Sequence, residues 1–253
     1  MSFGAPHRHF AVTDSTNTRA RELAEAGAPH GTVLTAGQQT EGRGRQGRTW
    51  TAPSGKALLY SAILRPLDRR HLLLPLAVPL AVCEAAEELG SGIACRVKWP
   101  NDVWVDERKL AGVLIEARPQ DGWAVIGVGL NLSIAPDEFP PELRDKAISL
   151  FGSCKGAGGK GRRSNSMEAP ATLPPSPIPA AEVLSRHLGR WAEADQETVL
   201  AEWRRRDALK GREVSWDGGA GVADGVEDSG DLVVLGDSGE RFVLGAGEVH
   251  LRV

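Results

Sequence analysis

The spacing of hydrophobic residues predicts a helix followed by two strands near the start of the chain. Ser15 or Thr16 can cap a helix whose apolar positions recur at helical spacing and which stops at Gly27. This helix is the first element that the pattern predicts. Residues 31–36 and 57–64 follow as strand-like apolar runs. The second run shows no polar alternation, which predicts a strand buried on both faces.

The pattern continues with a buried helix and a series of strands. Residues 72–89 are rich in leucine and alanine and stop at Gly90, which predicts a helix whose first turns accommodate Pro75 and Pro79. Residues 96–132 contain apolar runs separated by short turn-like sequences. We therefore expect an α+β fold with one mixed, mainly antiparallel sheet backed by helices.

The last part of the chain divides into a polar segment, a helical part and a β-rich tail. Residues 152–180 are rich in glycine, proline, serine and basic residues, which predicts a flexible insertion. Helical spacing resumes between residues 181 and 209, and residues 211–253 contain short β-like runs broken by glycines. We expect a large domain over residues 10–205 and a small C-terminal β-barrel over residues 206–253.

Composition and charge indicate a globular protein. The 253 residues are 41% hydrophobic, which is enough for a packed core. The formal net charge of -3 argues against general binding to nucleic acid or membranes. Residues 1–10 lack an apolar signal segment, and Cys83, Cys95 and Cys154 show no spacing typical of zinc sites. We expect a cytoplasmic protein without a membrane span, a disulfide framework or a tightly bound prosthetic group.

A glycine- and arginine-rich loop at residues 39–50 carries the strongest chemical signal. Its glycines form a G-x-G-x-x-G pattern, but the residues that follow do not favour the helix that a dinucleotide site requires. Glycines let backbone N–H groups approach an anion, and guanidinium groups suit carboxylate and phosphate oxygens. The loop therefore predicts a polyanion site, with a solvated basic turn or a nonspecific RNA contact as alternatives. The residues concerned are Gly42, Gly44 and Gly47, with Arg43, Arg45 and Arg48.

Two lysines lie in the strand-rich region that follows. Lys98 stands between Val97 and Trp99, and Lys109 precedes an apolar pair and a glycine. Apolar neighbours can place the ammonium group of such a lysine in a partly buried site. A surface hairpin with a solvated lysine is the alternative.

Glycines on alternate positions mark the strand at residues 125–131. Gly127 and Gly129 lie on one face of this strand, where missing side chains leave room for a flat group. Asn131 can offer its amide to an adenine edge. Glycine pairs in strands also mark bulges, which is the structural alternative.

Five segments of the chain form an ordered set of motifs. They are Asp14-Ser-Thr-Asn17, Gly42-Arg-Gly-Arg-Gln-Gly-Arg48 with Trp50, Lys98-Trp-Pro-Asn-Asp102, Arg108-Lys-Leu-Ala-Gly112 and Gly127-Val-Gly-Leu-Asn131. In this order they resemble the biotin protein ligase family, over roughly residues 10–150 and again in the C-terminal barrel. The pattern begins at about Val12, which leaves no room for a helix-turn-helix domain, so the form without DNA binding is expected.

The resemblance implies a two-step reaction. Biotin is activated by ATP to biotinyl-5′-AMP with release of pyrophosphate, and is then transferred to a lysine of the biotin carboxyl carrier domain of a carboxylase. Mg²⁺ is expected with the nucleotide, and its ligands are not assigned. A lipoate ligase or an octanoyl transferase of the related family is the nearest alternative, followed by a module that only binds biotin or adenylate. Whether the protein forms a homodimer is left open.

The resemblance also implies residue roles. Catalytic roles fall to Arg43, Arg45, Asp102, which orients the incoming amine, and Lys109, which bridges carboxylate and phosphate. The expected biotin contacts are Ser15, Thr16, Asn17, Gln39, Arg43, Gly44, Arg45, Lys109 and Gly112. The expected ATP or adenylate contacts are Arg45, Arg48, Trp50, Lys98, Asn101, Gly129 and Asn131, with Trp50 covering the adenine.

The glycine- and arginine-rich loop departs from the family pattern at one position. Glu41 stands where the family usually has a small residue. Its charge beside three arginines predicts an internal ion pair that weakens anion binding. Residues 42–50 are further expected to be mobile before binding and to shield the acyl-adenylate from water afterwards.

Overall fold

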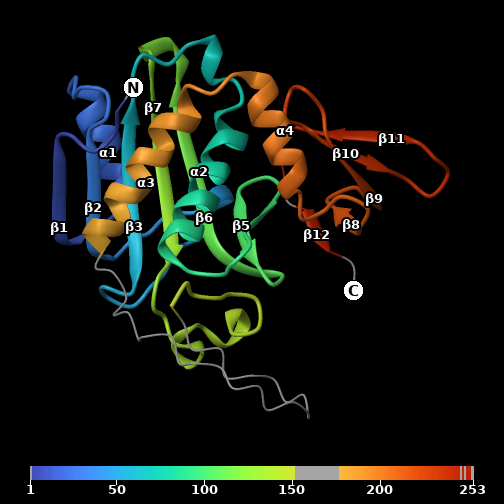
Figure 1. Cartoon of the computed structure of the whole chain (residues 1–253), viewed down its shortest axis with the longest axis horizontal. Helices are drawn as coiled ribbons and strands as arrows, with labels where there is room; N and C mark the ends of the chain where they lie inside the picture. Colours follow the sequence, from blue (N-terminus) through green and yellow to red (C-terminus); the bar gives the residue numbers. More distant parts are fainter. Residues whose placement is uncertain (1, 152–176, 246, 248, 252–253) are drawn as a thin grey trace.

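The computed structural model describes residues 2–151, 177–245, 247 and 249–251, so most of the predicted flexible insertion lies outside the described residues. Within them the chain forms four α-helices and twelve strands (Figure 1). The helices are α1 (Thr16–Glu25), α2 (Leu74–Leu89), α3 (Pro177–Ala192) and α4 (Gln196–Arg206). The strands are β1 (His7–Thr13), β2 (Val33–Gln39), β3 (Ala57–Leu64), β4 (Arg96–Lys98), β5 (Asp102–Val105), β6 (Arg108–Arg118), β7 (Trp123–Asn131), β8 (Glu213–Trp216), β9 (Gly219–Val226), β10 (Leu232–Leu235), β11 (Arg241–Leu244) and β12 (Val249–Leu251).

A seven-stranded sheet forms the centre of the larger domain. Its strand order is β1-β2-β3-β7-β6-β5-β4. β1 runs parallel to β2, and the other neighbouring strands pair antiparallel. The expected α+β fold with a mixed, mainly antiparallel sheet is confirmed.

The middle of this sheet is built from its most apolar strands. All 8 residues of β3 are buried, as the absence of polar alternation predicts. β3 pairs with β7 from Ala57 opposite Asn131 to Leu64 opposite Ala124. β7 in turn pairs with β6 in a register that sets Gly112 opposite Gly129. Two residues without side chains therefore lie next to each other on the same face of the sheet.

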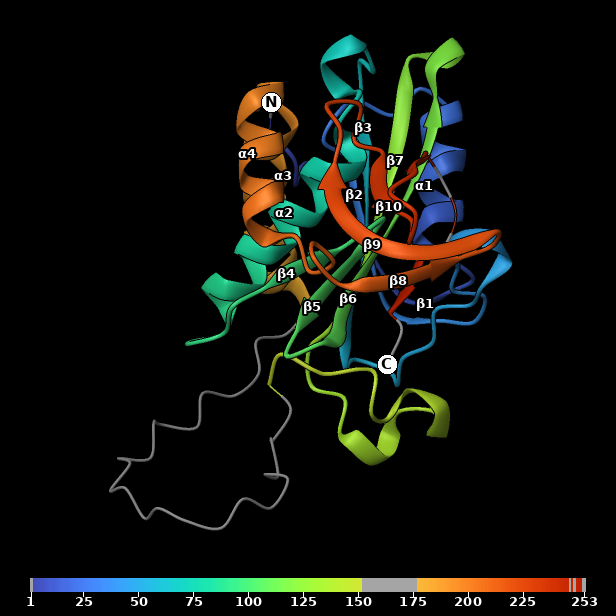
Figure 2. The ribbon, with the colours of Figure 1, turned by 90° about the vertical axis from the view of Figure 1, so that its right-hand side faces the viewer.

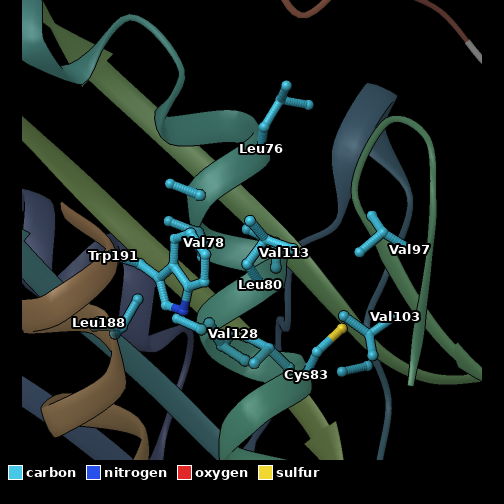
Figure 3. Close-up of a cluster of buried hydrophobic side chains, with 14 of the residues drawn as sticks. Leu76, Val78, Leu80, Cys83, Val97, Val103, Val113, Val128, Leu188 and Trp191 are labelled. Atoms are coloured by element: carbon cyan, nitrogen blue, oxygen red, sulfur yellow. The ribbon is translucent and has the colours of Figure 1, made fainter. Parts of the chain in front are cut away.

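The two faces of the large sheet are covered differently (Figure 2). α2, α3 and α4 lie on one side and α1 lies on the other. The main core fills the space between the sheet and the α2–α3 layer, where Leu80 and Trp191 meet Val113 and Val128 from the strands (Figure 3). All four of these side chains are buried. This face is closed by apolar packing, and the site residues lie on the other face.

On the second face α1 covers only part of the sheet. Ala20 and Ala24 pack there with Leu34, Ile63 and Val125 in a small separate cluster. The short alanine side chains let the helix approach the strands closely. Beyond the N-terminal end of α1, polar residues, glycines and the loop at residues 40–56 cover this face. The candidate site lies in this region.

The C-terminal strands form a second, antiparallel sheet that packs beside the first (Figure 1). Its order is β11-β10-β9-β8-β12. No pairing between β11 and β12 is present within the described residues, so there the sheet stays open at its two outer strands. Its contacts with the rest of the chain include the indole of Trp99, which donates a hydrogen bond to the carbonyl of Gly230 at 3.2 Å, and the ion pair of Arg212 with Glu107.

Three element boundaries differ from the prediction. The first element is the strand β1, which precedes the predicted first helix and has mostly exposed residues at the edge of the sheet. Its apolar residues follow no buried alternation, so only its pairing with β2 reveals it. α3 begins at Pro177, inside the predicted insertion, because prolines are tolerated in the first turn of a helix. α4 ends at Arg206, before the predicted end at Leu209.

Trp203 provides a test of how the helical layer is held to the sheet. Its side chain is fully buried, and its Nε1 has no hydrogen-bond partner within the described residues. We expect Trp203→Ala to lower the free energy of unfolding by about 3–5 kcal/mol, because it leaves a large cavity. Trp203→Phe should lower it by only about 1–2 kcal/mol, since no hydrogen bond is lost. Urea unfolding followed by circular dichroism measures both, and equal losses for the two variants would contradict this account.

Candidate active site

Four polar side chains meet where α1 begins and β2 and β3 pass beneath it. Thr16 donates from its backbone N and its Oγ1 to Gln39 Oε1, at 2.7 Å and 3.0 Å. Ser61 Oγ lies 2.8 Å from Thr16 Oγ1 and 2.6 Å from Asn17 Oδ1. Thr16, Asn17 and Ser61 are all buried. The structure therefore brings together three residues of the predicted biotin site, with Ser61 as an additional member.

The hydrogen bonds of this polar cluster are not all made at once. The Ser61 hydroxyl has one proton, whereas two oxygens, Thr16 Oγ1 and Asn17 Oδ1, lie within reach of it. Ser61 can therefore donate to only one of these two acceptors at a time, and the other is left without its proton. A ligand that presents both N–H donors and a carbonyl acceptor can complete such a set.

Asp14 fixes the start of α1 and so the position of this polar cluster. Its Oδ1 accepts a hydrogen bond from the backbone N of Ser15 at 2.6 Å and from Arg19 Nε at 2.9 Å. The Arg19 guanidinium holds the pKa of the Asp14 carboxyl well below its usual range. The carboxylate thus stays charged and keeps Ser15, which is itself buried, at the N-cap of the helix.

A glycine is needed at position 127 because the Asn17 side chain of the polar cluster occupies the space where a side chain would lie. A Cβ atom at this position would lie 2.1 Å from Asn17 Oδ1. The room that this missing side chain leaves is therefore filled by Asn17. The expected space for a flat group is found at the next glycine along the same face.

The indole of Trp50 lies on that second glycine. A Cβ atom at Gly129 would lie 2.4 Å from Trp50 Cε2, and one at the opposing Gly112 would lie 3.1 Å from Trp50 Cζ3. Trp50 Nε1 is buried and has no hydrogen-bond partner among the residues that the structure describes. We call the backbone of Gly112 and Gly129 the glycine floor.

The loop that carries Trp50 is folded back on itself as a small hairpin. Arg43 pairs with Thr49, Gly44 N donates to Arg48 O at 2.7 Å, and Trp50 N donates to Gly42 O at 2.9 Å. A side chain at Gly42 would collide with the Trp50 carbonyl, since its Cβ would lie 2.2 Å from that oxygen. The motif glycine thus serves the close approach of two backbone segments.

Lys109 and Asp102 form an ion pair at the edge of the glycine floor. Lys109 Nζ lies 2.7 Å from Asp102 Oδ1 and 5.6 Å from the centre of the Trp50 ring. Asp102 stands opposite Gly112 in the pairing of β5 with β6. The two predicted catalytic residues are therefore in contact, and Lys109 reaches the same indole that covers the floor. The pair keeps this end of the site close to neutral until an anion competes for the ammonium group.

Arg45 and Asn101 line a separate cavity of about 290 Å³ between the larger domain and the C-terminal sheet. The walls of this cavity include Trp99 and Gly230, whose hydrogen bond joins the two domains. Asn101 Nδ2 donates to the carbonyl of Val113 at 2.7 Å. Two predicted nucleotide contacts thus meet at the junction of the two domains.

The remaining predicted residues have other neighbours. Asn131 Nδ2 donates to the carbonyls of Ile148, at 3.1 Å, and Lys109, at 3.4 Å, and the residue is buried. Lys98 Nζ lies 5.3 Å from the ring centre of Trp104. The structure therefore does not bring Lys98 or the Asn131 amide nitrogen to the glycine floor. Gly44 and Arg48 belong to the loop hairpin.

Two residues of the site were missed in the sequence. Ser61 is a single hydroxyl in an otherwise apolar run that also holds Tyr60, and only the pairing of β3 with its neighbours shows that it faces α1. Glu116 accepts hydrogen bonds from Arg43 Nη1 and Asn17 Nδ2, both at 3.0 Å. The prediction of an internal pair at Glu41 is wrong: Glu41 forms no ion pair within the described residues, and the acid paired with Arg43 is Glu116.

In the described part of the chain, no group of three or more histidine, cysteine, aspartate or glutamate side chains is arranged to hold a metal ion. No helix in the same residues is long and apolar enough to cross a bilayer.

Comparison with known proteins agrees with this fold. The family model described as "Biotin/lipoate A/B protein ligase family" matches residues 9–132. The biotin--[acetyl-CoA-carboxylase] ligase of Mycobacterium tuberculosis is 33% identical over 96% of this chain and 88% of its own length. A structure of biotin protein ligase from Aquifex aeolicus in complex with biotin and ATP has a TM-score of 0.72 and 29% identity, over 98% of this chain and 99% of that one.

The bifunctional ligase/repressor BirA of Bacillus subtilis is 40% identical over 55% of this chain. The match covers 44% of the length of that relative, so this chain spans less than half of it. The relatives from Mycobacterium tuberculosis and Paracoccus denitrificans match over nearly the whole chain, and both are named biotin--[acetyl-CoA-carboxylase] ligase. The chain belongs to the biotin protein ligase family.

The contact between Trp50 and the glycine floor can be tested. We expect Gly129→Ala to displace the indole and to speed hydrogen exchange of the amides of residues 42–50, since the added Cβ would overlap the ring. Trp50→Ala should speed the same amides to a similar extent. The double variant should add little to either, because both changes remove one contact. Hydrogen-exchange mass spectrometry reads all three, and additive effects would argue against the contact.

Proposed function

We propose that this protein activates biotin with ATP and transfers it to a lysine of a biotin carboxyl carrier domain. The observation that carries the proposal is the single face on which the polar cluster, the glycine floor and the Lys109–Asp102 pair follow one another. The names of the full-length relatives and the biotin and ATP of the Aquifex aeolicus complex support the same reaction.

The polar cluster suits the ureido head of biotin. A ureido group has two N–H donors and one carbonyl acceptor, and the cluster offers hydroxyl and amide groups that can both donate and accept. The buried acceptor that lacks a proton from Ser61 would receive a ligand N–H. A ligand without such a head would leave buried polar groups unsatisfied, which is costly.

The other end of the face suits the two reacting anions. The carboxylate of biotin attacks the α-phosphorus of ATP, and pyrophosphate leaves. Lys109 would neutralise charge that develops between carboxylate and phosphate, with Arg45 approaching from the domain junction. Asp102, which holds Lys109 in the structure, would then orient the amine of the acceptor lysine as it attacks the acyl carbon and AMP leaves.

The Trp50 indole occupies the glycine floor, so the nucleotide would bind against the indole and the residues around it. Trp50 is proposed to stack on the adenine, and the hairpin of residues 42–50 to exclude water from the mixed anhydride. Mg²⁺ would arrive bound to the phosphates of ATP, since this ion keeps phosphate and water ligands and needs few protein oxygens. The adenine-reading role of Asn131 would have to use its amide oxygen, because its amide nitrogen is already engaged by two carbonyls.

Lipoate or octanoate is the competing acyl substrate, because the matching family model includes lipoate ligases. These acids lack the ureido head. They would leave unsatisfied the acceptor of the polar cluster that receives no proton from Ser61, so the polar cluster favours biotin.

Exchange of labelled pyrophosphate into ATP tests the proposed adenylation. With Mg²⁺ and biotin we expect rapid exchange by the wild type, and none above background with lipoate, octanoate or no acid. Lys109→Ala should slow exchange by about 100-fold or more, as expected for loss of a group that stabilises developing charge. Lys210→Ala, at an exposed position, serves as the control and should keep wild-type exchange. Exchange that depends on lipoate would move the chain to the related ligases, and exchange with none of the acids would leave a binding module.

A further inference from the structure

One carboxylate links Arg43 of the glycine- and arginine-rich loop to Asn17 of α1, in addition to the hydrogen bonds that Gln39 accepts from Thr16. Glu116 Oε1 accepts a hydrogen bond from Arg43 Nη1 of the loop, and Oε2 accepts one from Asn17 Nδ2 of the helix, each at 3.0 Å. Each oxygen of the carboxylate is thus bonded to a different segment. Arg43 and Asn17 form no hydrogen bond with each other within the described residues, so the connection between these two side chains runs through Glu116.

The position of Glu116 in β6 places it on the face of the site. Side chains two residues apart in a strand share a face, so Glu116, Leu114 and Gly112 follow one another along the floor. Gly112 lies under Trp50 next to Lys109, and Glu116 lies at the polar cluster. β6 therefore carries both ends of the site on one strand.

Glu116 also determines which way the Asn17 amide points. Asn17 Nδ2 donates to Glu116 and, at 3.3 Å, to the carbonyl of Leu114, so Oδ1 is left to accept from Ser61. A carboxylate cannot donate a proton, which makes the flipped amide unfavourable. The same charge neutralises Arg43, which is half-exposed at this pair. Arg43 is thus paired with a protein carboxylate at the polar cluster, as Lys109 is paired with Asp102 at the glycine floor.

We propose that Glu116 is a positioning residue that holds the loop hairpin beside the polar cluster through Arg43 and orients Asn17 toward the ureido head. This rests on the proposed biotin ligase function. In this assignment the Arg43 side chain holds the loop in place, while the neutralisation of carboxylate and phosphate falls to Lys109 and Arg45. Loss of this connection weakens binding of the acid and exposes the acyl-adenylate, and it leaves the chemical step itself largely intact.

The first test is made without substrate. Glu116→Ala should speed hydrogen exchange of residues 42–50, Arg43→Ala should do the same, and the double variant should add little, because the two changes break one connection. Glu107→Ala is the matched control, since it removes the same side chain from another glutamate–arginine pair, with Arg212, and should leave the exchange of residues 42–50 unchanged. Unchanged exchange in Glu116→Ala would overturn this connection, whatever the enzyme's substrate.

The second test separates binding from chemistry in the pyrophosphate exchange assay. Glu116→Ala should raise the KM for biotin about tenfold with kcat altered by less than about twofold, and should increase release of AMP in the absence of an acceptor. Glu116→Gln can still accept from Asn17 through its amide oxygen and should raise the KM by only about two- to threefold. A fall in kcat with unchanged KM, or wild-type values in Glu116→Ala, would overturn the proposal. Failure of the wild type to exchange with biotin would instead count against the proposed function.

Discussion

The pairing of β6 with β7 is the constraint on which the site depends. Its register sets Gly112 opposite Gly129, and the absence of two side chains at that point leaves a strip of bare backbone on a sheet that is otherwise filled. A slip of β6 by one residue would turn Gly112 to the core and set Ala111 or Val113 beside Gly129 under Trp50. The other strand pairings and the α2–α3 layer keep this register, since the same strands bury Val113 and Val128 on the opposite face.

Charge is paired throughout the candidate site. Lys109 is held by Asp102, Arg43 by Glu116 and Arg19 by Asp14. An anionic ligand must therefore compete with carboxylates, so the site does not bind every anion that approaches it. Specificity for one acid then comes from the buried hydroxyl and amide groups next to it, where an incomplete set of hydrogen bonds is costly.

One of the hydrogen bonds between the two sheets lies near the residues expected to contact the nucleotide. Trp99 belongs to the lysine-containing motif of the larger domain and donates to Gly230 of the C-terminal sheet. Arg45 and Asn101 line the cavity between the domains. A ligand that reaches this cavity would touch both domains, which gives the small C-terminal sheet a reason to be retained beside the reaction centre.

The sequence by itself determined the elements and the class of the protein. The apolar run at residues 57–64 was sufficient to predict the buried β3, and the ordered motifs were sufficient to predict the ligase family, because both signals are local in the chain. The edge strand β1, the role of Ser61 and the pairing of Arg43 with Glu116 were decided only by the tertiary structure. Their partners lie between 26 and 73 positions away along the chain, for instance 73 for Arg43 and Glu116 and 45 for Thr16 and Ser61. Local spacing carries no record of such contacts, because strand order and register are set by the packing of the whole sheet.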